Sequence, residues 1–222
     1  TYRNRKSKYT RSKSRSKNFK KYKLNLIFQK IYNNSLPLKN DLLKTGHQIL
    51  HNEGISFNGK LVGINPGASF GSAKRWLTNR YAEVLDRLIK EQNAEIVIFG
   101  SSSELTIANE ICQFMKYRPV IMSGRTSLSH LMALISFCQL LITNDSGPMH
   151  LASALQVPTL ALFGSTNEIT TGPLNPLSVV LNKKVECSPC LLRECPIDHH
   201  CMTEITIEEV YQKAIKILQK TN

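Results

Sequence analysis

Leu61-Val-Gly-Ile-Asn-Pro-Gly67 opens a strand, loop and helix pattern that the rest of the chain repeats. The run is apolar up to Asn65 and stops at Pro66-Gly67, which is typical of a short buried strand followed by a turn. Thr78 is then a candidate N-cap. The helix it predicts has one apolar stripe, formed by Tyr81, Val84, Leu85, Leu88 and Ile89.

The same alternation continues to the end of the chain. Four more apolar runs predict strands at Glu95–Phe99, Pro119–Met122, Leu140–Thr143 and Pro158–Phe163. Helices are expected at Leu105–Met115, from Thr126 as the cap through Cys138, at Ser146–Leu155, and at Ile207–Gln219 behind a Thr206/Glu209 capping box. Continuous apolar strands with short connections predict an α/β fold, a doubly wound, Rossmann-like parallel sheet with both faces covered.

Ligands bind such sheets beyond the carboxyl ends of the strands. The loops after Ile64, Phe99, Met122, Thr143 and Phe163 are therefore expected to carry the function.

Charge is unevenly distributed along the 222 residues. The net charge is +13, from 29 Lys and Arg against 16 Asp and Glu, but residues 1–23 hold 11 of the basic residues and no acidic ones. Residues 24–222 are therefore close to neutral, at +2. We expect 1–23 to be a basic disordered tail, either simply solvated or docking on phosphates or anionic lipid. No folded nucleic-acid motif accompanies it, so nucleic acid is not the expected partner.

Several classes of protein are excluded. Leu131–Ile142, the longest apolar stretch, is too short to cross a bilayer, and the basic N-terminus lacks the apolar segment of a signal peptide. Six cysteines in a chain of this length favour a reducing cytoplasm over secretion. Residues 24–59 are expected to be a linker or the remnant of an N-terminal domain, with Pro37 and Gly46 marking a loop-rich connection.

Two loops carry groups suited to anions. Asn65-Pro-Gly-Ala-Ser-Phe-Gly-Ser-Ala-Lys-Arg-Trp76 offers glycines, hydroxyls and cations before a helix, either as a phosphate cradle or as an ordinary solvated turn. Thr143-Asn-Asp-Ser-Gly-Pro-Met-His150 places a helix N-terminus, with its free amides, beside His150. Between them, Glu104 follows the second strand, where it could accept from ribose hydroxyls or serve only helix electrostatics. Together the loops predict a nucleotide diphosphate ligand.

Five ordered motifs carry a resemblance to a known family: the 65–76 loop, Ser123-Gly-Arg-Thr-Ser-Leu128, Asn144-Asp-Ser-Gly-Pro-Met-His-Leu-Ala152, Leu162-Phe-Gly-Ser165 and Cys187-Ser-Pro-Cys-Leu-Leu-Arg-Glu-Cys195. Over residues 60–220 the chain resembles the C-terminal, donor-binding half of the ADP-heptose:lipopolysaccharide heptosyltransferases, closest to their heptosyltransferase II branch. These are inverting GT-B glycosyltransferases with two facing Rossmann-like domains. The resemblance implies that residues 60–222 form a nucleotide-sugar-binding domain.

The resemblance also assigns roles to residues. Ser69 and Lys74 would hold the donor diphosphate, Glu104 the ribose, and the Thr126 region the adenine. The residues at the helix start would face the diphosphate and the sugar: Asp145, Ser146, Gly147 and His150. No metal is implied for catalysis, because cations and amides stabilise charge on the departing ADP.

The family's reaction transfers L-glycero-D-manno-heptose from ADP-heptose to the lipopolysaccharide inner core. This implies a cytoplasmic location, peripheral at the inner face of the inner membrane. The acceptor-activating acidic residue belongs to the family's N-terminal domain, so the catalytic base is expected outside these residues. We therefore expect the chain alone to bind ADP or ADP-heptose and to transfer poorly. The alternatives are a truncated noncatalytic nucleotide-binding module, or an RNA- or membrane-docking protein that acts through the basic tail.

Four cysteines crowd into one segment with the spacing C-x2-C-x4-C-x5-C: Cys187, Cys190, Cys195 and Cys201. Four thiolates in a short loop could close a tetrahedral structural zinc site. The other interpretations are reduced cysteines that pack in the fold, and disulfides.

Overall fold

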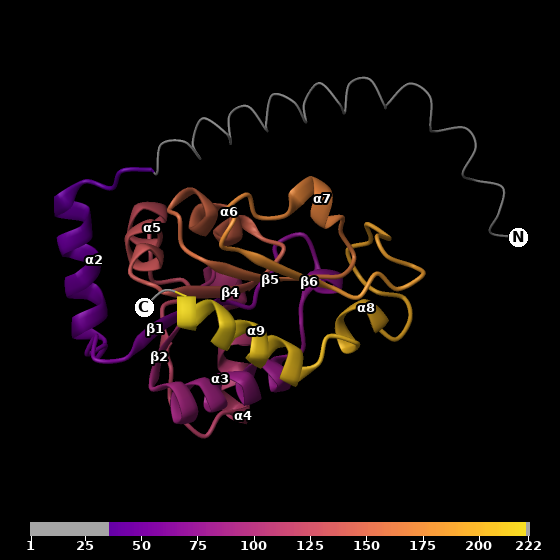
Figure 1. The fold of residues 1–222 in the computed structure, drawn as a ribbon, viewed down its shortest axis with the longest axis horizontal. Coiled ribbons are helices and arrows are strands. Elements are labelled where there is room, and N and C mark those ends of the chain that lie inside the picture. Colours follow the sequence, from indigo (N-terminus) through magenta and orange to yellow (C-terminus); the bar gives the residue numbers. More distant parts are fainter. Residues whose placement is uncertain (1–35, 221–222) are drawn as a thin grey trace, which may run out of the picture.

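The computed structural model describes residues 36–220, which form one six-stranded, wholly parallel sheet with helices on both faces (Figure 1). The strand order is β3-β2-β1-β4-β5-β6. The strands are β1 (Lys60–Asn65), β2 (Ala94–Ile98), β3 (Val120–Ile121), β4 (Leu140–Asn144), β5 (Thr159–Phe163) and β6 (Val179–Asn182). The helices are α2 (Asn40–Asn52), α3 (Thr78–Gln92), α4 (Leu105–Phe114), α5 (Leu128–Ser136), α6 (Gly147–Ala154), α7 (Glu168–Thr171), α8 (His200–Thr203) and α9 (Ile207–Lys220).

Side chains from the strands alternate between two apolar layers. Val62 and Ile64 of β1 pack toward α3, α4 and α9, while Leu61 packs toward α2, α5 and α6. Figure 1 shows these two sets of helices on opposite faces of the sheet. Because each strand is apolar on both faces, it appears in the sequence as a continuous apolar run. The doubly wound α/β prediction is confirmed.

The five predicted strands are all present, and β6 was missed. It is a short edge strand whose four residues are only half-buried, and it pairs with β5 alone. Its sequence follows a loop with two prolines and has the short apolar run Val179-Val180-Leu181. Edge position alone does not explain the miss, because β3 is also a half-buried edge strand and was predicted. Unlike the other strands, β6 is not closely followed by a helix, since α8 begins only at His200.

Two predicted helix caps were wrong by one residue. Leu77, not Thr78, occupies the N-cap position of α3, and no side chain caps that helix. Ser127, not Thr126, caps α5 by accepting a hydrogen bond from the His130 amide at 3.2 Å. The capping box at Thr206 and Glu209 is confirmed, because each side chain accepts from the other residue's amide.

Gly46 is not in a loop, as predicted, but in the middle of α2. The helix packs on α5, where a Cβ at Gly46 would approach the Ala133 Cβ to 2.8 Å. Glycine therefore permits close helix contact here and does not mark a break. Leu50 and Ile55 join the core layer of α5 and α6. The division between 24–59 and 60–222 stays a prediction.

The basic tail 1–23 lies outside the described residues. So do four apolar residues that recur at helical spacing in the sequence, Leu24, Ile27, Phe28 and Ile31. Among the helices of residues 36–220, none has the length and apolar character needed to cross a membrane.

Candidate functional site

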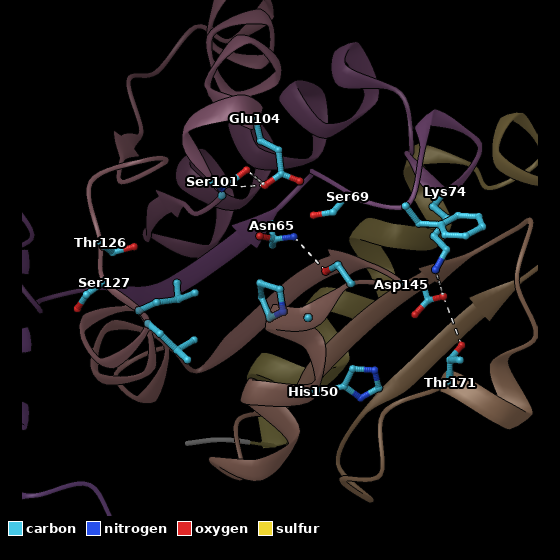
Figure 2. Close-up of a pocket in the computed structure, with 17 residues that line it drawn as sticks. Asn65, Ser69, Lys74, Ser101, Glu104, Thr126, Ser127, Asp145, His150 and Thr171 are labelled. Carbon is cyan, nitrogen blue, oxygen red and sulfur yellow. Dashed lines mark hydrogen bonds and ion pairs between the residues drawn. The ribbon is translucent and has the colours of Figure 1, made fainter. Parts of the chain in front are cut away.

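A cavity of about 610 Å³ opens at the carboxyl edge of the sheet. It lies over β1 and β4, where the chain reverses its direction of winding across the sheet, because β1 pairs with β2 on one side and β4 on the other. At this point the connecting loops diverge to opposite faces and leave a crevice. Figure 2 shows the residues that line it, which come from the loops after five different strands.

Two of the residues that line the cavity form an ion pair. Lys74 Nζ lies 2.6 Å from Asp145 Oδ2, and the two side chains are only 13% and 6% exposed. The Thr171 hydroxyl of α7 donates to the same carboxylate oxygen at 3.3 Å. Lys74 Nζ also lies 4.9 Å from the centre of the Phe70 ring. These contacts hold one ammonium group at a defined place beside the cavity (Figure 2).

Hydrogen bonds hold both ends of the loop that carries Lys74. Asn144, fully buried, donates from Nδ2 to the Pro66 carbonyl at 2.7 Å and accepts at Oδ1 from the Trp76 amide at 3.2 Å. Beside Lys74, the Ala73 amide donates to the Arg193 carbonyl at 2.9 Å, and the Ala73 carbonyl lies 3.0 Å from His199 Nε2. The cysteine-rich segment therefore supports the Lys74 loop, a contact that no sequence pattern indicated.

The start of α6 faces the cavity. Ser146 occupies the N-cap position, but its side chain does not cap the helix. Its hydroxyl instead accepts from Asn65 Nδ2 at 3.0 Å and lies 3.0 Å from Thr143 Oγ1. Gly147 follows, and a Cβ there would meet nothing within 4 Å. The first amides of a helix carry partial positive charge, so this end of α6 suits an anion.

His150 stands one turn into α6, beside the ion pair. Burial lowers the pKa of its imidazole below the ordinary value, the Asp145 carboxylate opposes that shift, and the Lys74 ammonium adds to it. His150 is therefore mostly neutral at pH 7 in the free protein, and a negative ligand would favour its protonated form.

Glu104 uses one carboxylate oxygen for structure. Its Oε2 accepts from the Ser101 amide at 2.8 Å and from the Ser101 hydroxyl at 2.9 Å. The other oxygen, Oε1, lies against Gly67, where a Cβ would approach it to 2.0 Å. Glu104 therefore stabilises the start of its helix through Oε2, and Oε1 takes no part in those hydrogen bonds. Both roles considered for Glu104 are open to the same side chain.

All eight predicted donor-binding residues line this one cavity: Ser69, Lys74, Glu104, Thr126, Asp145, Ser146, Gly147 and His150. Thr126 does not form the cap that was predicted for it. It borders the cavity together with Leu128 and Leu131 of α5. The other lining residues were not predicted to bind the donor, although some lie in the quoted motifs: Asn65, Phe70, Gly100, Ser101, Ser127, Leu128, Leu131, Pro148 and Thr171. Asn65 could have been found as the polar end of an apolar strand, whereas nothing local marks Thr171.

The four clustered cysteines are free thiols, with Cys187 exposed and Cys201 buried. Burial, with smaller contributions from the other three thiols, raises the pKa of Cys201 to about 11. Within residues 36–220, no group of three or more His, Cys, Asp or Glu side chains is arranged to hold a metal ion. The predicted zinc site therefore rests on the sequence spacing alone.

Comparison with known proteins identifies the family of the chain. The model of glycosyltransferase family 9 (heptosyltransferase) matches residues 19–200. The chain belongs to this family. Over 169 residues it is 39% identical to the lipooligosaccharide heptosyltransferase 2 of Campylobacter jejuni, covering 73% of this chain and 52% of that protein. The heptosyltransferase II likeness seen in the sequence is confirmed.

Solved structures of family 9 members agree. The ADP-heptose lipopolysaccharide heptosyltransferase II of Escherichia coli superposes with a TM-score of 0.71 at 29% identity, over 84% of this chain and 54% of that one. A family 9 glycosyltransferase from Veillonella parvula gives 0.72 at 26% identity, over 83% and 53%. The chain spans about half the length of the curated relatives it matches.

Proposed function

We propose that the chain is the donor-binding half of a heptosyltransferase that uses ADP-heptose. The observation that carries the proposal is the convergence of Lys74, the start of α6 and Glu104 on one cavity at the crevice of the sheet. Membership of family 9 supports this over the alternatives of a noncatalytic module or a protein acting through the basic tail. The name of the Escherichia coli heptosyltransferase II supports ADP-heptose as the donor.

The proposed roles of the lining residues give the donor a direction along the cavity. Figure 2 places Thr126 and Ser127 at one end, Lys74 and Asp145 at the other, and Asn65 between them. The adenine would lie by Thr126 and Leu128, the ribose by Glu104, and the diphosphate by Ser69, Lys74 and the start of α6. Asp145, already partnered by Lys74 and Thr171, would accept from sugar hydroxyls beside the β-phosphate.

The chemistry follows from these positions. An acceptor hydroxyl attacks the anomeric carbon from the face opposite ADP, the bond from that carbon to the phosphate oxygen breaks, and the electron pair leaves with ADP. Lys74, the Gly147 amide and a protonated His150 stabilise the negative charge that develops on the β-phosphate. These groups are fixed before the reaction, so they need little reorganisation during it. No metal is required for this stabilisation.

The remaining parts of the reaction lie with other residues. The base that removes the acceptor proton would come from the N-terminal half found in longer relatives, and the acceptor would be the lipopolysaccharide inner core. A location at the cytoplasmic face of the inner membrane, with peripheral attachment, follows from that acceptor. These points are part of the proposal.

Two measurements test it. Isothermal titration of the 222-residue chain with ADP should give saturable binding that UDP does not match. A transfer assay with ADP-heptose and heptose-deficient lipopolysaccharide should give little product from this chain alone. Failure to bind ADP would contradict the donor-half assignment, and robust transfer would contradict the expected need for a second domain.

A structural zinc ion held by Cys187, Cys190, Cys195 and Cys201 is a separate proposal. Its support is the sequence spacing of the four cysteines alone. Elemental analysis of protein purified without chelator decides it. About one zinc per chain supports the site, and a content near zero removes it.

A further inference from the structure

A second cavity, of about 230 Å³, lies at the edge of the sheet where the strands begin. It is formed by the last turns of α9, the start of β5 and the start of β6, and we call it the α9 groove. Pro158, Pro176, Val179 and Ile217 give it an apolar wall. Figure 1 shows α9 running back along the sheet from α8 toward the C-terminus. The α9 groove and the donor cavity therefore lie at opposite edges of the sheet.

Three lysines of α9 line the same groove. Lys213, Lys216 and Lys220 are three and four residues apart, so their side chains leave one face of the helix. They extend over about 10 Å of the helix axis. All three are exposed, and among the residues that the structure describes none of them forms an ion pair with a carboxylate. The groove thus has a rim of uncompensated positive charge.

The acidic residues of the same helix are compensated. Glu208 pairs with Arg87, and Glu209 pairs with Lys183, both in the first turn of α9. The helix dipole favours a cation in the last turn, and its effect falls off beyond that turn. Lys213 lies about two turns before the end of α9, so the dipole does not account for it.

An exposed leucine adjoins the lysines. Leu177 lines the groove and is 52% exposed. The loop that carries it is held in place, because the Leu177 amide donates to Asn175 Oδ1 at 2.8 Å and the Asn175 amide donates to Ser153 Oγ at 2.8 Å. An apolar side chain held in solvent beside cations combines the two features by which proteins attach to anionic membrane surfaces.

Charge and apolar character together select the occupant. Residues 1–23 and a second copy of the chain are both basic overall, so neither matches a rim of lysines. Free phosphate would pair with the lysines but would gain nothing from the apolar wall or Leu177. An anionic phospholipid suits both parts, because it joins a phosphate group to an apolar body. We propose that the α9 groove is a docking surface for anionic phospholipids in a bilayer.

This inference rests on the proposed function for the peripheral attachment, to which it adds a specific surface. It does not require that the donor cavity hold any particular nucleotide. Because the two sites lie at opposite edges of the sheet, a docked chain keeps its donor cavity accessible. Vesicle binding and ADP binding are therefore separate readouts.

The test is cosedimentation of the 222-residue chain with vesicles of equimolar phosphatidylglycerol and phosphatidylcholine, and with vesicles of phosphatidylcholine alone. The wild type should bind the mixed vesicles and not the neutral ones. Each lysine near an anionic membrane contributes roughly fivefold to the partition coefficient, so the triple variant Lys213→Glu, Lys216→Glu, Lys220→Glu should lose at least about 30-fold.

A second triple variant is the matched control: Lys39→Glu, Lys44→Glu, Lys116→Glu. It changes the net charge by the same amount at exposed positions that do not line the groove, and residues 1–23 are the same in both variants. It should lose less than about fivefold. Equal losses from the two triple variants would overturn the proposal, because net charge alone would then explain the binding.

Leu177→Gln tests the apolar part without changing the charge. It should lower the partition coefficient about threefold, whereas Leu105→Gln, at a 40% exposed position of α4 outside the groove, should leave it unchanged. Equal partition coefficients for Leu177→Gln and the wild type would remove the membrane contact assigned to Leu177 and overturn the proposal.

Two further results would assign the groove to another occupant. Displacement from the mixed vesicles by millimolar inorganic phosphate would indicate a site for small anions. Binding of the wild type to polyglutamate but not to mixed vesicles would indicate an acidic protein partner. Either result overturns the proposal and leaves ADP binding, the test of the proposed function, untouched. If the chain binds mixed vesicles through the groove but binds no ADP, the proposed function fails and the docking surface stands.

Discussion

Lys74 Nζ and Asp145 Oδ2 are 2.6 Å apart although 71 residues separate them in the chain. Both side chains are mostly buried, so each charge depends on the other. A buried pair of this kind is expensive to break by removing one partner, because the other charge is left without compensation. The same pair presents the cation that a diphosphate would meet.

Lys74→Ala should therefore affect both stability and binding. We expect a loss of roughly 3 kcal/mol in the free energy of unfolding, measured with urea, and at least a tenfold loss of ADP affinity. Adding Asp145→Asn should restore much of the stability, because the uncompensated charge is gone, but not the affinity. Lys90→Ala, at an exposed position in the last turn of α3, is the control and should change neither. Recovery of ADP binding in the double variant would exclude Lys74 as a phosphate ligand.

His150 should respond to ligand through its protonation. Its pKa in the free protein lies below 6.5, chiefly because of burial, and a bound diphosphate should raise it by favouring the imidazolium. ADP affinity should thus increase as the pH falls through this range. NMR titration of the imidazole with and without ADP measures the shift, and His150→Gln assigns the signal. Because ADP itself titrates nearby, the pH dependence is compared between wild type and His150→Gln, and an identical dependence would rule out proton uptake at His150.

The lowered pKa also predicts a direction for stability. The unfolded chain binds a proton at His150 more readily than the folded chain, so the contribution of this residue is present above pH 6.5 and is lost as the pH falls below it. His150→Gln should flatten that part of the stability profile. Denaturant midpoints measured between pH 5 and 8 (chosen about the ordinary histidine pKa) check the sign.

Gly147→Ala should separate folding from binding. A Cβ at this position meets nothing within 4 Å, so the fold should tolerate it, and a helical alanine adds up to about 1 kcal/mol of stability. The methyl group would occupy space beside the first amide of α6, so ADP affinity should fall about tenfold. Gly46→Ala is the opposite case, since its Cβ would lie 2.8 Å from the Ala133 Cβ. It should lower the melting temperature and leave ADP affinity little changed, and the reverse pattern in this pair would refute the assignment.

Asn144 should be the main structural support of the site. Its side chain forms hydrogen bonds with the Pro66 carbonyl, the Trp76 amide and the Tyr81 hydroxyl, which are all buried. Asn144→Ala leaves these groups unpaired and should cost roughly 3 kcal/mol or more, with weaker ADP binding because the Lys74 loop is released. Tyr81→Phe removes one of the three hydrogen bonds and should cost about 1 kcal/mol with binding unchanged. Equal losses from the two variants would contradict this account.

The predicted and the missed features differ in a consistent way. Leu61–Asn65 and Leu140–Thr143 could be identified as strands because burial on both faces makes the whole run apolar. Val179–Asn182 was missed, although its first three residues are apolar, because no helix follows it closely to complete the repeating strand and helix pattern. Thr126 was taken for a cap because both Thr and Ser can cap a helix, and only the backbone geometry shows that Ser127 does so here. Gly46 was interpreted as a break because the sequence does not show that α5 lies against it.

The candidate site likewise has residues that the sequence predicted and contacts that it did not. Residues near strand ends, such as Lys74, Glu104 and Asp145, were predictable because the parallel fold brings all carboxyl strand ends to one edge of the sheet. The sequence by itself determined the fold class, the edge of the sheet where a ligand is expected and the residue types available there. Only the tertiary structure decided that Lys74 pairs with Asp145, that Arg193 supports the Lys74 loop, and that Asn65 keeps an oxygen without a partner. The reason is physical: apolar periodicity is a local property of the chain, whereas the partner of a polar atom depends on which distant loop folds against it.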